Sequence, residues 1–313
     1  MLRTVRSIGA HIVFVTLMIT TVLFLSFSQL GFSRYIEKTP ITVSVEDVII
    51  AVKTTGKYHR SRVLDIVDTW FQLAPNIIFF VTDTEDEYLN KITGNKVILC
   101  DCLLGHTRES LCCKMNAELE LFTSVKSRWG CHFDDDNYVH IAELLKLLEK
   151  YDPSADWYLG KPSTLGPVNL ENANDKVDFW FATGGAGFCL SRSLLTKMVS
   201  YIRNGGFEML GEQLKLPDDI TLGYLINHLL NVNLTFIQKF HSHLEPLQDI
   251  PGDDLRDQIS LSAGSYVKGE RNLVNVPVIF STKDDPRRFR SLHCFLYTDS
   301  CNQRSTLPIL KVT

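Results

Sequence analysis

The sequence predicts an α/β protein with a mostly parallel sheet that carries helices on both faces. Short runs of β-branched and aromatic residues alternate with segments of helical periodicity, and these runs are apolar on both sides. Continuous apolar runs are typical of strands in a parallel sheet that is buried between helices. The chain has 313 residues, 45% of them hydrophobic and 22% charged, which is enough for a packed core. With 32 Lys and Arg against 36 Asp and Glu, it lacks the basic surplus of a nucleic-acid-binding protein.

The first βαβ unit is the clearest part of this pattern. Strands are predicted at 48–53 and 77–82, and the helix between them, 60–72, places apolar residues at helical spacing. The further predicted elements are strands at 97–100 and 128–133 and helices at 107–124, 138–151, 191–203 and 219–230. Ser191 is the expected N-cap of its helix.

The N-terminus contains an apolar segment that is long enough to cross a bilayer, which takes about 20 residues. Arg3 and Arg6 precede it, and no further charged residue occurs before Arg34, so a type II arrangement with a lumenal main domain is expected. A cleaved signal peptide is the alternative, but no clear small-x-small cleavage site follows. The anchor and the signal peptide would both place the main domain in an oxidising compartment, where cysteines form disulfides. The predicted segments are a cytoplasmic tail, a membrane anchor, a stem and a lumenal domain at residues 1–11, 12–32, 33–46 and 47–313.

Three adjacent aspartates, Asp134, Asp135 and Asp136, follow one predicted strand directly and precede a helix. Ligands of open α/β sheets bind at the carboxyl ends of the strands. Neighbouring carboxylates repel one another unless a cation relieves the repulsion, and Mg²⁺ or Mn²⁺ that bridges to a substrate diphosphate would do so. The alternative is a solvated turn in which one aspartate caps the helix. The strand-to-helix context favours the metal.

Three other segments concentrate unusual residues. The glycine-rich segment 179–189 allows a close approach of backbone to a ligand, or it is a tight turn. Asp218 and Asp219 begin a predicted helix, where acidic residues are also ordinary. His241 and His243 would face the same side of an extended segment, although such a pair is more often a surface feature than a metal site. No CxxC or HExxH spacing occurs, so a zinc site has no support.

Seven motifs occur in a characteristic order along the chain. They are VKTTGKYHRSR (52–62), CDCLLGHTRESLCCKM (100–115), CHFDDDNYV (131–139), FWFATGGAGFC (179–189), LPDDITLGY (216–224), FHSHLE (240–245) and DPRRFRSLHC (285–294). Together they resemble the Fringe family, Golgi β-1,3-N-acetylglucosaminyltransferases that extend O-linked fucose on EGF-like repeats of Notch. The resemblance runs from Asp47 to Cys301. It implies a GT-A-like nucleotide-diphospho-sugar transferase fold, inverting chemistry, UDP-GlcNAc as donor, Mn²⁺ as cofactor and a place in the Golgi membrane.

The resemblance also implies roles for single residues. Asp136 is expected to ligate the metal directly, together with His243, which is the second histidine of FHSHLE. Asp135 and Asp134 are expected to contact the ribose and the sugar side of the donor. Mn²⁺ tolerates such a mixed set of nitrogen and oxygen ligands.

Two further residues complete the implied site. Asp219, the second acidic residue of LPDD, matches the catalytic base of the family. Arg62 resembles a nucleotide-contacting arginine, and its guanidinium suits uracil or a diphosphate. An N-glycan is expected at Asn233, the one N-x-S/T sequon of the chain.

Six of the eight cysteines are expected to pair in the order of the family, as Cys102–Cys113, Cys131–Cys189 and Cys294–Cys301. Cys100 and Cys112 then remain, and they are expected to pair with each other. The loop closed by Cys294 and Cys301 is shorter than in the family. This difference does not touch the motif residues.

Two other functions stay open on the sequence. One is a related β-1,3-galactosyl- or glucosyltransferase with another acceptor. The other is an inactive, transferase-like folding partner that has lost the metal motif. The presence of the aspartate triplet 134–136, Asp219 and His243 argues against the inactive protein.

Overall fold

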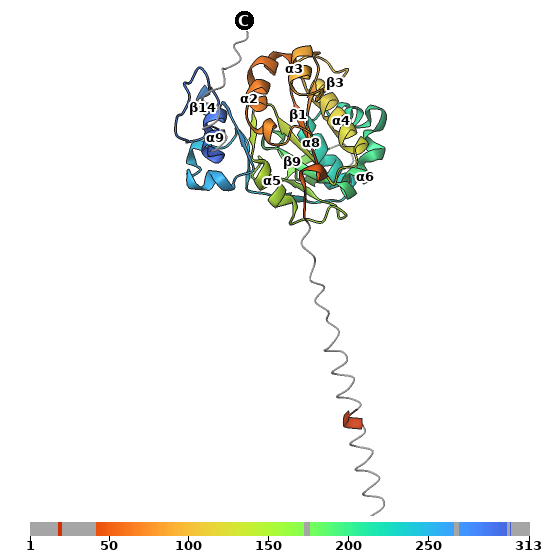
Figure 1. The fold of residues 1–313 in the computed structure, drawn as a ribbon. Coiled ribbons are helices and arrows are strands. Elements are labelled where there is room, and N and C mark those ends of the chain that lie inside the picture. Colours follow the sequence, from red (N-terminus) through yellow and green to blue (C-terminus); the bar gives the residue numbers. More distant parts are fainter. Residues whose placement is uncertain (1–17, 21–41, 172–175, 266–268, 299–300, 302–313) are drawn as a thin grey trace, which may run out of the picture. The chain divides into compact units, whose positions relative to one another are not determined.

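The structure is a computed structural model that describes residues 18–20, 42–171, 176–265, 269–298 and 301 (Figure 1). The chain divides into two compact units, Met1–Ile41 and Thr42–Thr313. In the first unit only residues 18–20 are described, and they are helical. The predicted anchor at 12–32 therefore lies almost wholly outside the described residues. Among the residues that are described, no helix has the length and apolarity to span a bilayer.

The second unit is built on a seven-stranded sheet with the order β10-β6-β9-β4-β1-β2-β3. The strands are β1 (Val48–Lys53), β2 (Ile78–Thr82), β3 (Val97–Leu99), β4 (Trp129–Asp134), β6 (Tyr158–Gly160), β9 (Phe188–Ser191) and β10 (Leu234–Phe236). All neighbours pair in parallel except β9, which runs antiparallel to both β4 and β6. The predicted mostly parallel sheet is confirmed.

Helices cover both faces of this sheet, as predicted. On one face, α4 (Arg108–Ser124) and α6 (Arg192–Ile202) pack on the strands, and α7 (Gly206–Leu214) and α8 (Asp218–Gly223) pack against α4 and join the same core. On the opposite face, Phe80 of β2 and Phe133 of β4 contact Phe71 and Trp70 of the short helical segment that follows α2 (Leu64–Val67). Figure 1 shows α4 and α6 on one side of the sheet and α2 on the other.

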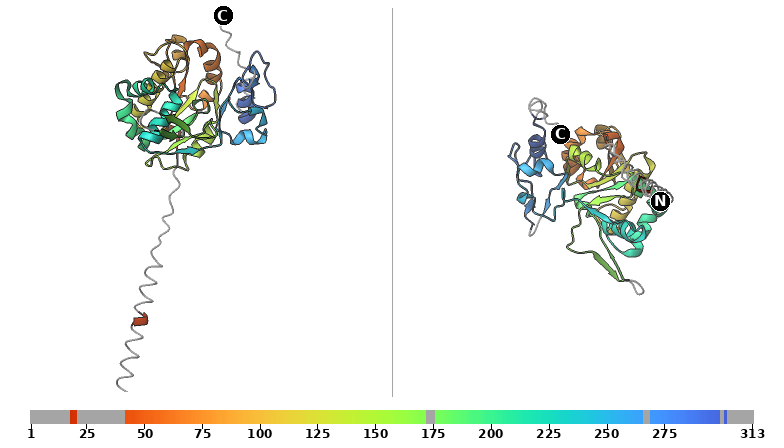
Figure 2. Two further views of the ribbon diagram at one scale, coloured as in Figure 1. Left: turned by 180° about the vertical axis from the view of Figure 1, so that it is seen from behind. Right: turned by 90° about the horizontal axis from the view of Figure 1, so that it is seen from below.

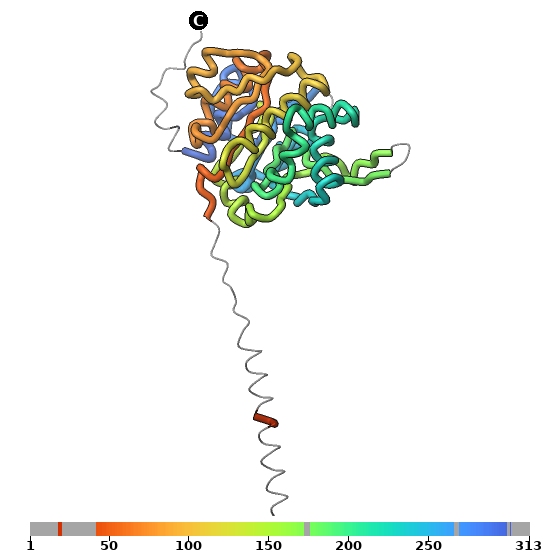
Figure 3. Tube along the Cα trace, turned by 90° about the vertical axis from the view of Figure 1, so that its right-hand side faces the viewer, coloured from red at the N-terminus to blue at the C-terminus, as the bar shows by residue number. Residues whose placement is uncertain are grey.

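The C-terminal part packs beside the first βαβ unit. Helix α9 (Phe289–Leu296, blue) lies next to α2 (orange) in Figures 1 and 2, and Arg290 donates to Asp65 at 2.5 Å. A small sheet combines β5 (Asn137–Val139), β11 (Phe240–His241) and β12 (Ser260–Ser262). The remaining elements are helix α3 (Glu87–Ile92), helix α5 (Ile141–Leu148), the hairpin of β13 (Gly264–Ser265) and β14 (Arg271–Asn272), and the hairpin of β7 (Val168–Glu171) and β8 (Lys176–Phe179), which projects in Figure 3.

Three predicted helices differ from the structure. The helix expected at 138–151 begins only at Ile141, because residues 137–139 pair with β12 as strand β5. The segment 60–72 is broken into a π-helical turn, α2 and a 3₁₀ turn, and 219–230 continues α8 as a π-helical turn. Ser191 does cap α6, since its hydroxyl accepts from the Leu194 N–H.

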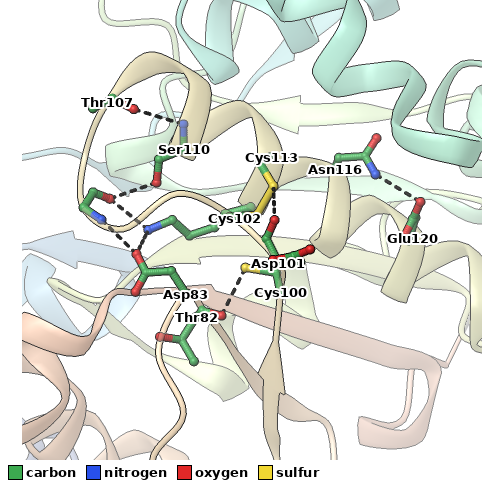
Figure 4. Close-up of a disulfide and its surroundings, with 12 residues drawn as sticks. Thr82, Asp83, Cys100, Asp101, Cys102, Thr107, Ser110, Cys113, Asn116 and Glu120 are labelled. Carbon is green, nitrogen blue, oxygen red and sulfur yellow. Dashed lines mark hydrogen bonds and ion pairs between the residues drawn. A yellow bond between two sulfur atoms is a disulfide. The ribbon is translucent and has the colours of Figure 1, made fainter.

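All three disulfides that the resemblance implies are present in the structure, Cys102–Cys113, Cys131–Cys189 and Cys294–Cys301. Figure 4 shows the first of them, which ties the segment after β3 to α4. Cys131 and Cys189 are direct partners on β4 and β9. This link therefore holds the one antiparallel strand to the strand that ends in the acidic triplet.

The expected pairing of Cys100 with Cys112 is wrong, because the structure leaves both unpaired. The thiol of Cys100 donates to the Thr82 carbonyl at 3.0 Å, and that of Cys112 to the Leu216 carbonyl at 3.7 Å. The reason lies in α4, where consecutive residues point in directions about 100° apart. Cys113 thus faces the segment after β3, whereas Cys112 is buried toward Leu216.

Loss of a disulfide is expected to destabilise this protein according to the length of the loop that it closes. Replacing Cys131 and Cys189 with alanine opens a loop of 58 residues, whereas replacing Cys294 and Cys301 opens one of 7. Chain entropy predicts losses of about 4 and about 2 kcal/mol, respectively, in the free energy of unfolding. Urea denaturation of the two double variants measures both losses. Equal losses would contradict the entropic account.

Candidate active site

The acidic triplet lies at the carboxyl end of β4, in the tight turn that leads into β5. Asp135 accepts hydrogen bonds from the Thr54 hydroxyl at 2.7 Å and from Arg62 at 2.8 Å. Asp136 accepts from Arg62 at 3.1 Å and from the Ser262 hydroxyl at 3.0 Å. None of the three aspartates caps α5, whose N-cap position is His140. The capping alternative is therefore wrong, and one arginine bridges the second and third carboxylates.

Arg62 is held in place by the π-helical turn His59–Val63 that follows β1. His59 anchors this turn, because its ring nitrogens contact Asp86 at 3.0 Å and the Thr82 hydroxyl at 2.8 Å. The Arg62 guanidinium lies over the Tyr58 ring, 3.9 Å from the ring centre. Stacking and two charged hydrogen bonds fix the fork of the guanidinium at the acidic turn.

The three carboxylates of the turn differ in their electrostatics. Burial, together with the charges of Asp134 and Asp135, raises the pKa of Asp136 to about 7. Burial also raises the pKa of Asp135 above its ordinary value, against the opposing charge of Arg62. At Asp134, burial is outweighed by the nearby Lys53 and His132, and the pKa is lowered. The turn therefore holds more negative charge than its protein partners neutralise, and a cation would relieve it.

His243 lies in the turn after β11 and is surrounded by glycine backbone. A Cβ atom on Gly264 would come within 2.7 Å of the His243 Cβ, and one on Gly185 within 3.4 Å of its Nδ1. This buried Nδ1 has no hydrogen-bond partner in the described part of the chain. Burial lowers the pKa of His243, so the ring is neutral at pH 7 and its nitrogens are able to bind a metal.

His241 has a different place from His243, so the two histidines do not form a pair on one strand face. Strand β11 ends at His241, whose Nε2 contacts the Gln258 side-chain oxygen at 2.8 Å. His243 belongs to the following turn. The Nδ1 of His241 lies 3.1 Å from Glu245 Oε2, so both of its ring nitrogens face protein groups, whereas His243 Nδ1 has no hydrogen-bond partner among the described residues.

Asp136 and His243 meet at the same short segment, residues 262–264. The Asp136 carbonyl accepts from the Ala263 N–H at 2.9 Å, and the next residue, Gly264, packs against His243. Within the described residues, no three His, Cys, Asp or Glu side chains are grouped so as to hold a metal ion alone. The unpartnered imidazole nitrogen of His243 and the excess negative charge of the acidic turn nevertheless suit a divalent cation. Substrate phosphates would then supply the remaining ligands.

Asp219 lies in the first turn of α8 and faces the glycine-rich loop. Its Oδ2 accepts from the Gly184 N–H at 3.2 Å and its Oδ1 from the Ile220 N–H at 2.8 Å. Burial and the neighbouring charge of Asp218 raise the pKa of Asp219 to about 6. This carboxylate is thus ionised at neutral pH and more basic than an ordinary aspartate.

The glycine-rich loop is where these groups come together. Gly184 donates to Asp219, and the next residue, Gly185, packs against His243. Gly187 has a φ of +86°, and a Cβ there would come within 2.3 Å of the Phe133 ring. The loop is thus a tight turn, as one alternative held, and its small residues let two candidate functional side chains approach the backbone.

Sequence reasoning missed the charged groups behind the acidic turn. Lys53 lies 2.6 Å from Asp218 and 3.4 Å from Asp134. His132 contacts Glu118 of α4 at 2.5 Å. The sequence does contain one signal for these pairs. Lys53 ends an apolar predicted strand, and a lysine in such a place indicates a buried carboxylate partner.

Comparisons with known proteins agree with the motif resemblance. The Fringe-like family profile matches residues 43–300. A Fringe glycosyltransferase of Drosophila melanogaster is 47% identical over 264 residues, which cover 82% of this chain and 64% of the relative. The β-1,3-N-acetylglucosaminyltransferase lunatic fringe of Homo sapiens is 46% identical over 259 residues, 81% of this chain and 68% of the relative.

Similarity to solved structures is weaker. A galactosyltransferase crystallised with donor and acceptor sugar analogues overlaps with a TM-score of 0.37 and 14% identity, over 59% of this chain and 72% of that chain. An overlap of this size supports no conclusion about the present site. The family profile and the two relatives, by contrast, cover nearly all of the second unit. The chain therefore belongs to the Fringe-like family.

Proposed function

We propose that this chain is a GT-A-type inverting glycosyltransferase that moves GlcNAc from UDP-GlcNAc onto O-linked fucose of EGF-like repeats, in β-1,3 linkage, and so modulates Notch signalling. One observation carries the proposal: Asp219 and His243 contact successive glycines of one loop, and His243 shares the segment 262–264 with Asp136. A candidate base and candidate metal ligands are thus assembled in one place. The name of the human relative, a β-1,3-N-acetylglucosaminyltransferase, supports the transferred sugar and the linkage.

Asp219 is the proposed general base of a single displacement. The acceptor is a sugar hydroxyl, which is a poor nucleophile at neutral pH until a carboxylate takes its proton. The Gly184 and Ile220 N–H groups fix both carboxylate oxygens of Asp219. Its pKa of about 6 leaves it ionised at pH 7 while strengthening it as a base. Inversion from an α-linked donor to a β product follows from one displacement.

Asp136 and His243 are the proposed ligands of Mn²⁺. When bound there, the ion would offset the charge of the diphosphate that leaves with UDP. Asp135 and Asp134 are proposed to contact the ribose and the sugar side of the donor. Arg62 is proposed to contact the uracil or the diphosphate, and its hydrogen bonds to Asp135 and Asp136 support this role because they hold it beside the proposed donor-contacting residues.

The proposal includes a place in the Golgi membrane, with residues 12–32 as a type II anchor and the second unit in the lumen. The three disulfides suit an oxidising compartment. Asn233, the proposed glycan site, is exposed directly before β10.

A donor screen tests the proposed reaction against its alternatives. The purified second unit is incubated with UDP-GlcNAc, UDP-galactose or UDP-glucose and an O-fucosylated EGF-like repeat, and the product is identified by mass spectrometry. Transfer of GlcNAc is expected. Preference for another sugar would favour a related β-1,3-transferase, and no transfer from any donor would favour the inactive folding partner.

The metal requirement gives a first prediction. Asp136→Ala is expected to abolish transfer, and His243→Ala to weaken it, because one carboxylate and the phosphates still hold the ion. Initial rates with added Mn²⁺, and after its removal by EDTA, measure both effects. His241→Ala is the matched control and is expected to keep most activity, since His241 contacts Gln258 instead. Full activity of the parent enzyme in excess EDTA would exclude the metal.

Replacing the base gives a second prediction. Asp219→Asn keeps an oxygen that accepts from one of the Gly184 and Ile220 N–H groups, but it cannot take a proton. The expected loss in kcat is about 100-fold to 10,000-fold, with folding and donor binding preserved. If Asp219 were only a helix residue, the rate would stay near that of the parent. Asp253→Asn, an exposed substitution, is the control.

The pH dependence gives a third prediction. Because protonated Asp219 cannot accept a proton, kcat/KM measured at saturating Mn²⁺, which competes with protonation of Asp136, is expected to fall as pH drops through about 6, by about tenfold per unit at lower pH. The folded protein must remain intact over this range, which circular dichroism at each pH verifies. An acid limb near pH 4, the range of an ordinary aspartate, would contradict the assignment.

A further inference from the structure

Lys53 is a buried lysine that lies between the two acidic segments of the site. It ends β1, and the parallel register of β1 with β4 makes it the direct partner of Asp134. Only 8% of Lys53 is exposed. Its Nζ lies 2.6 Å from Asp218 Oδ2 and 3.4 Å from Asp134 Oδ1. One ammonium group thus joins the acidic turn after β4 to the start of α8.

The contact with Asp218 matters because Asp218 is the neighbour of the proposed base. Asp218 and Asp219 are consecutive carboxylates in the first turn of α8. Two carboxylates so close together oppose each other's ionisation, and a cation that pairs with one of them reduces that effect on the other. Lys53 is that cation, since it makes a hydrogen bond of 2.6 Å with Asp218.

We propose that Lys53 is a positioning residue for the transfer reaction, which ties the donor-contacting turn to the base segment and offsets the charge of Asp218 beside Asp219. The inference rests on the proposed function of Asp219 as the base. Lys53 touches neither Asp219 nor any reacting atom in the described contacts, so it acts through Asp218 and Asp134.

The groups that face Asp219 make its titration a direct measure of this role. The peptide N–H groups of Gly184 and Ile220 bond its two oxygens. Among the described residues, the charged and titratable groups near Asp219 are Asp218, which raises its pKa, Lys53, which lowers it, the phenol of Tyr158, and the ring of His132, which packs at Gly184 as Asp219 does. Removing Lys53 and removing Asp218 should therefore shift the pKa of Asp219 in opposite directions.

If the role of Lys53 were purely structural, its loss would not shift the pKa of Asp219. A second buried lysine, Lys114, provides the matched control. Lys114 is 2% exposed, and its Nζ pairs with Asp83 at 2.8 Å and bonds the Thr54 and Gly105 carbonyls. It holds the disulfide-linked segment around Cys102 that Figure 4 shows. Loss of either lysine removes one buried ion pair, but only Lys53 is paired with the neighbour of the base.

The experiment compares Lys53→Met, Asp218→Asn, the double variant with both changes, and Lys114→Met. The pKa of the Asp219 carboxyl is measured by ¹³C NMR with labelled aspartate, the signal being assigned with Asp219→Asn. Lys53→Met is expected to raise this pKa by about one unit and Asp218→Asn to lower it. The double variant, which removes one charge of each sign, should titrate near the parent, as should Lys114→Met.

Transfer kinetics provide the second readout. The acid limb of kcat/KM should follow the Asp219 pKa in each variant, and Lys53→Met should also raise the KM for UDP-GlcNAc, because Asp134 loses its partner. An unchanged Asp219 pKa in folded Lys53→Met, or an equal shift in Lys114→Met, would overturn the proposal. If Lys53→Met does not fold, the proposal is tested with Asp218→Asn. An Asp219 pKa that fails to drop in this variant would contradict the proposal.

The titration separates this inference from the proposed function. A parent protein that transfers no sugar would refute the proposed reaction, while the NMR shifts would still decide whether Lys53 offsets the charge of Asp218. Conversely, if the enzyme is active but the Asp219 pKa is unchanged in Lys53→Met, the proposed reaction would stand and the proposed role of Lys53 would be refuted.

Discussion

The parallel pairing of β1 with β4 is the constraint on which the rest of the site depends. Its six-residue register ends with Lys53 beside Asp134, so the carboxyl ends of both strands open at the same edge of the sheet. The chain after β1 then supplies Thr54 and Arg62 to the carboxylates of the acidic turn after β4. A register shifted by one residue would turn Lys53 to the opposite face and leave buried carboxylates without a partner.

The antiparallel strand β9 adds the second constraint. It enters the sheet between β4 and β6, and the Cys131–Cys189 disulfide fastens it to β4. The glycine-rich loop before β9 must therefore cross the edge where the acidic turn lies. Glycine is required in this loop at Gly187, because a Cβ there would overlap Phe133, and it is required in β13 at Gly264, because a Cβ there would overlap the Cβ of His243. Close packing of backbone thus brings His243 and Asp219 to neighbouring positions.

Buried charge connects these parts. Glu118 of α4 pairs with His132, Lys53 pairs with Asp134 and Asp218, and Arg62 pairs with the two remaining carboxylates of the turn. Removing one partner from such pairs leaves an uncompensated buried charge, which is strongly destabilising. Burial and the charges of neighbouring aspartates raise the pKa of Asp136 to about 7 and that of Asp219 to about 6.

The sequence by itself determined the α/β class, the parallel strands, the capped helix α6 and the acidic, glycine-rich and histidine motifs, because periodicity and local charge act over a few residues. Through resemblance it also indicated the three disulfides. Only the tertiary structure decided that residues 137–139 form a strand, that Cys112 turns away from Cys100, and that Lys53 joins two acidic segments. These features depend on strand register and on which helix face meets which strand, and residues far apart in the chain set both.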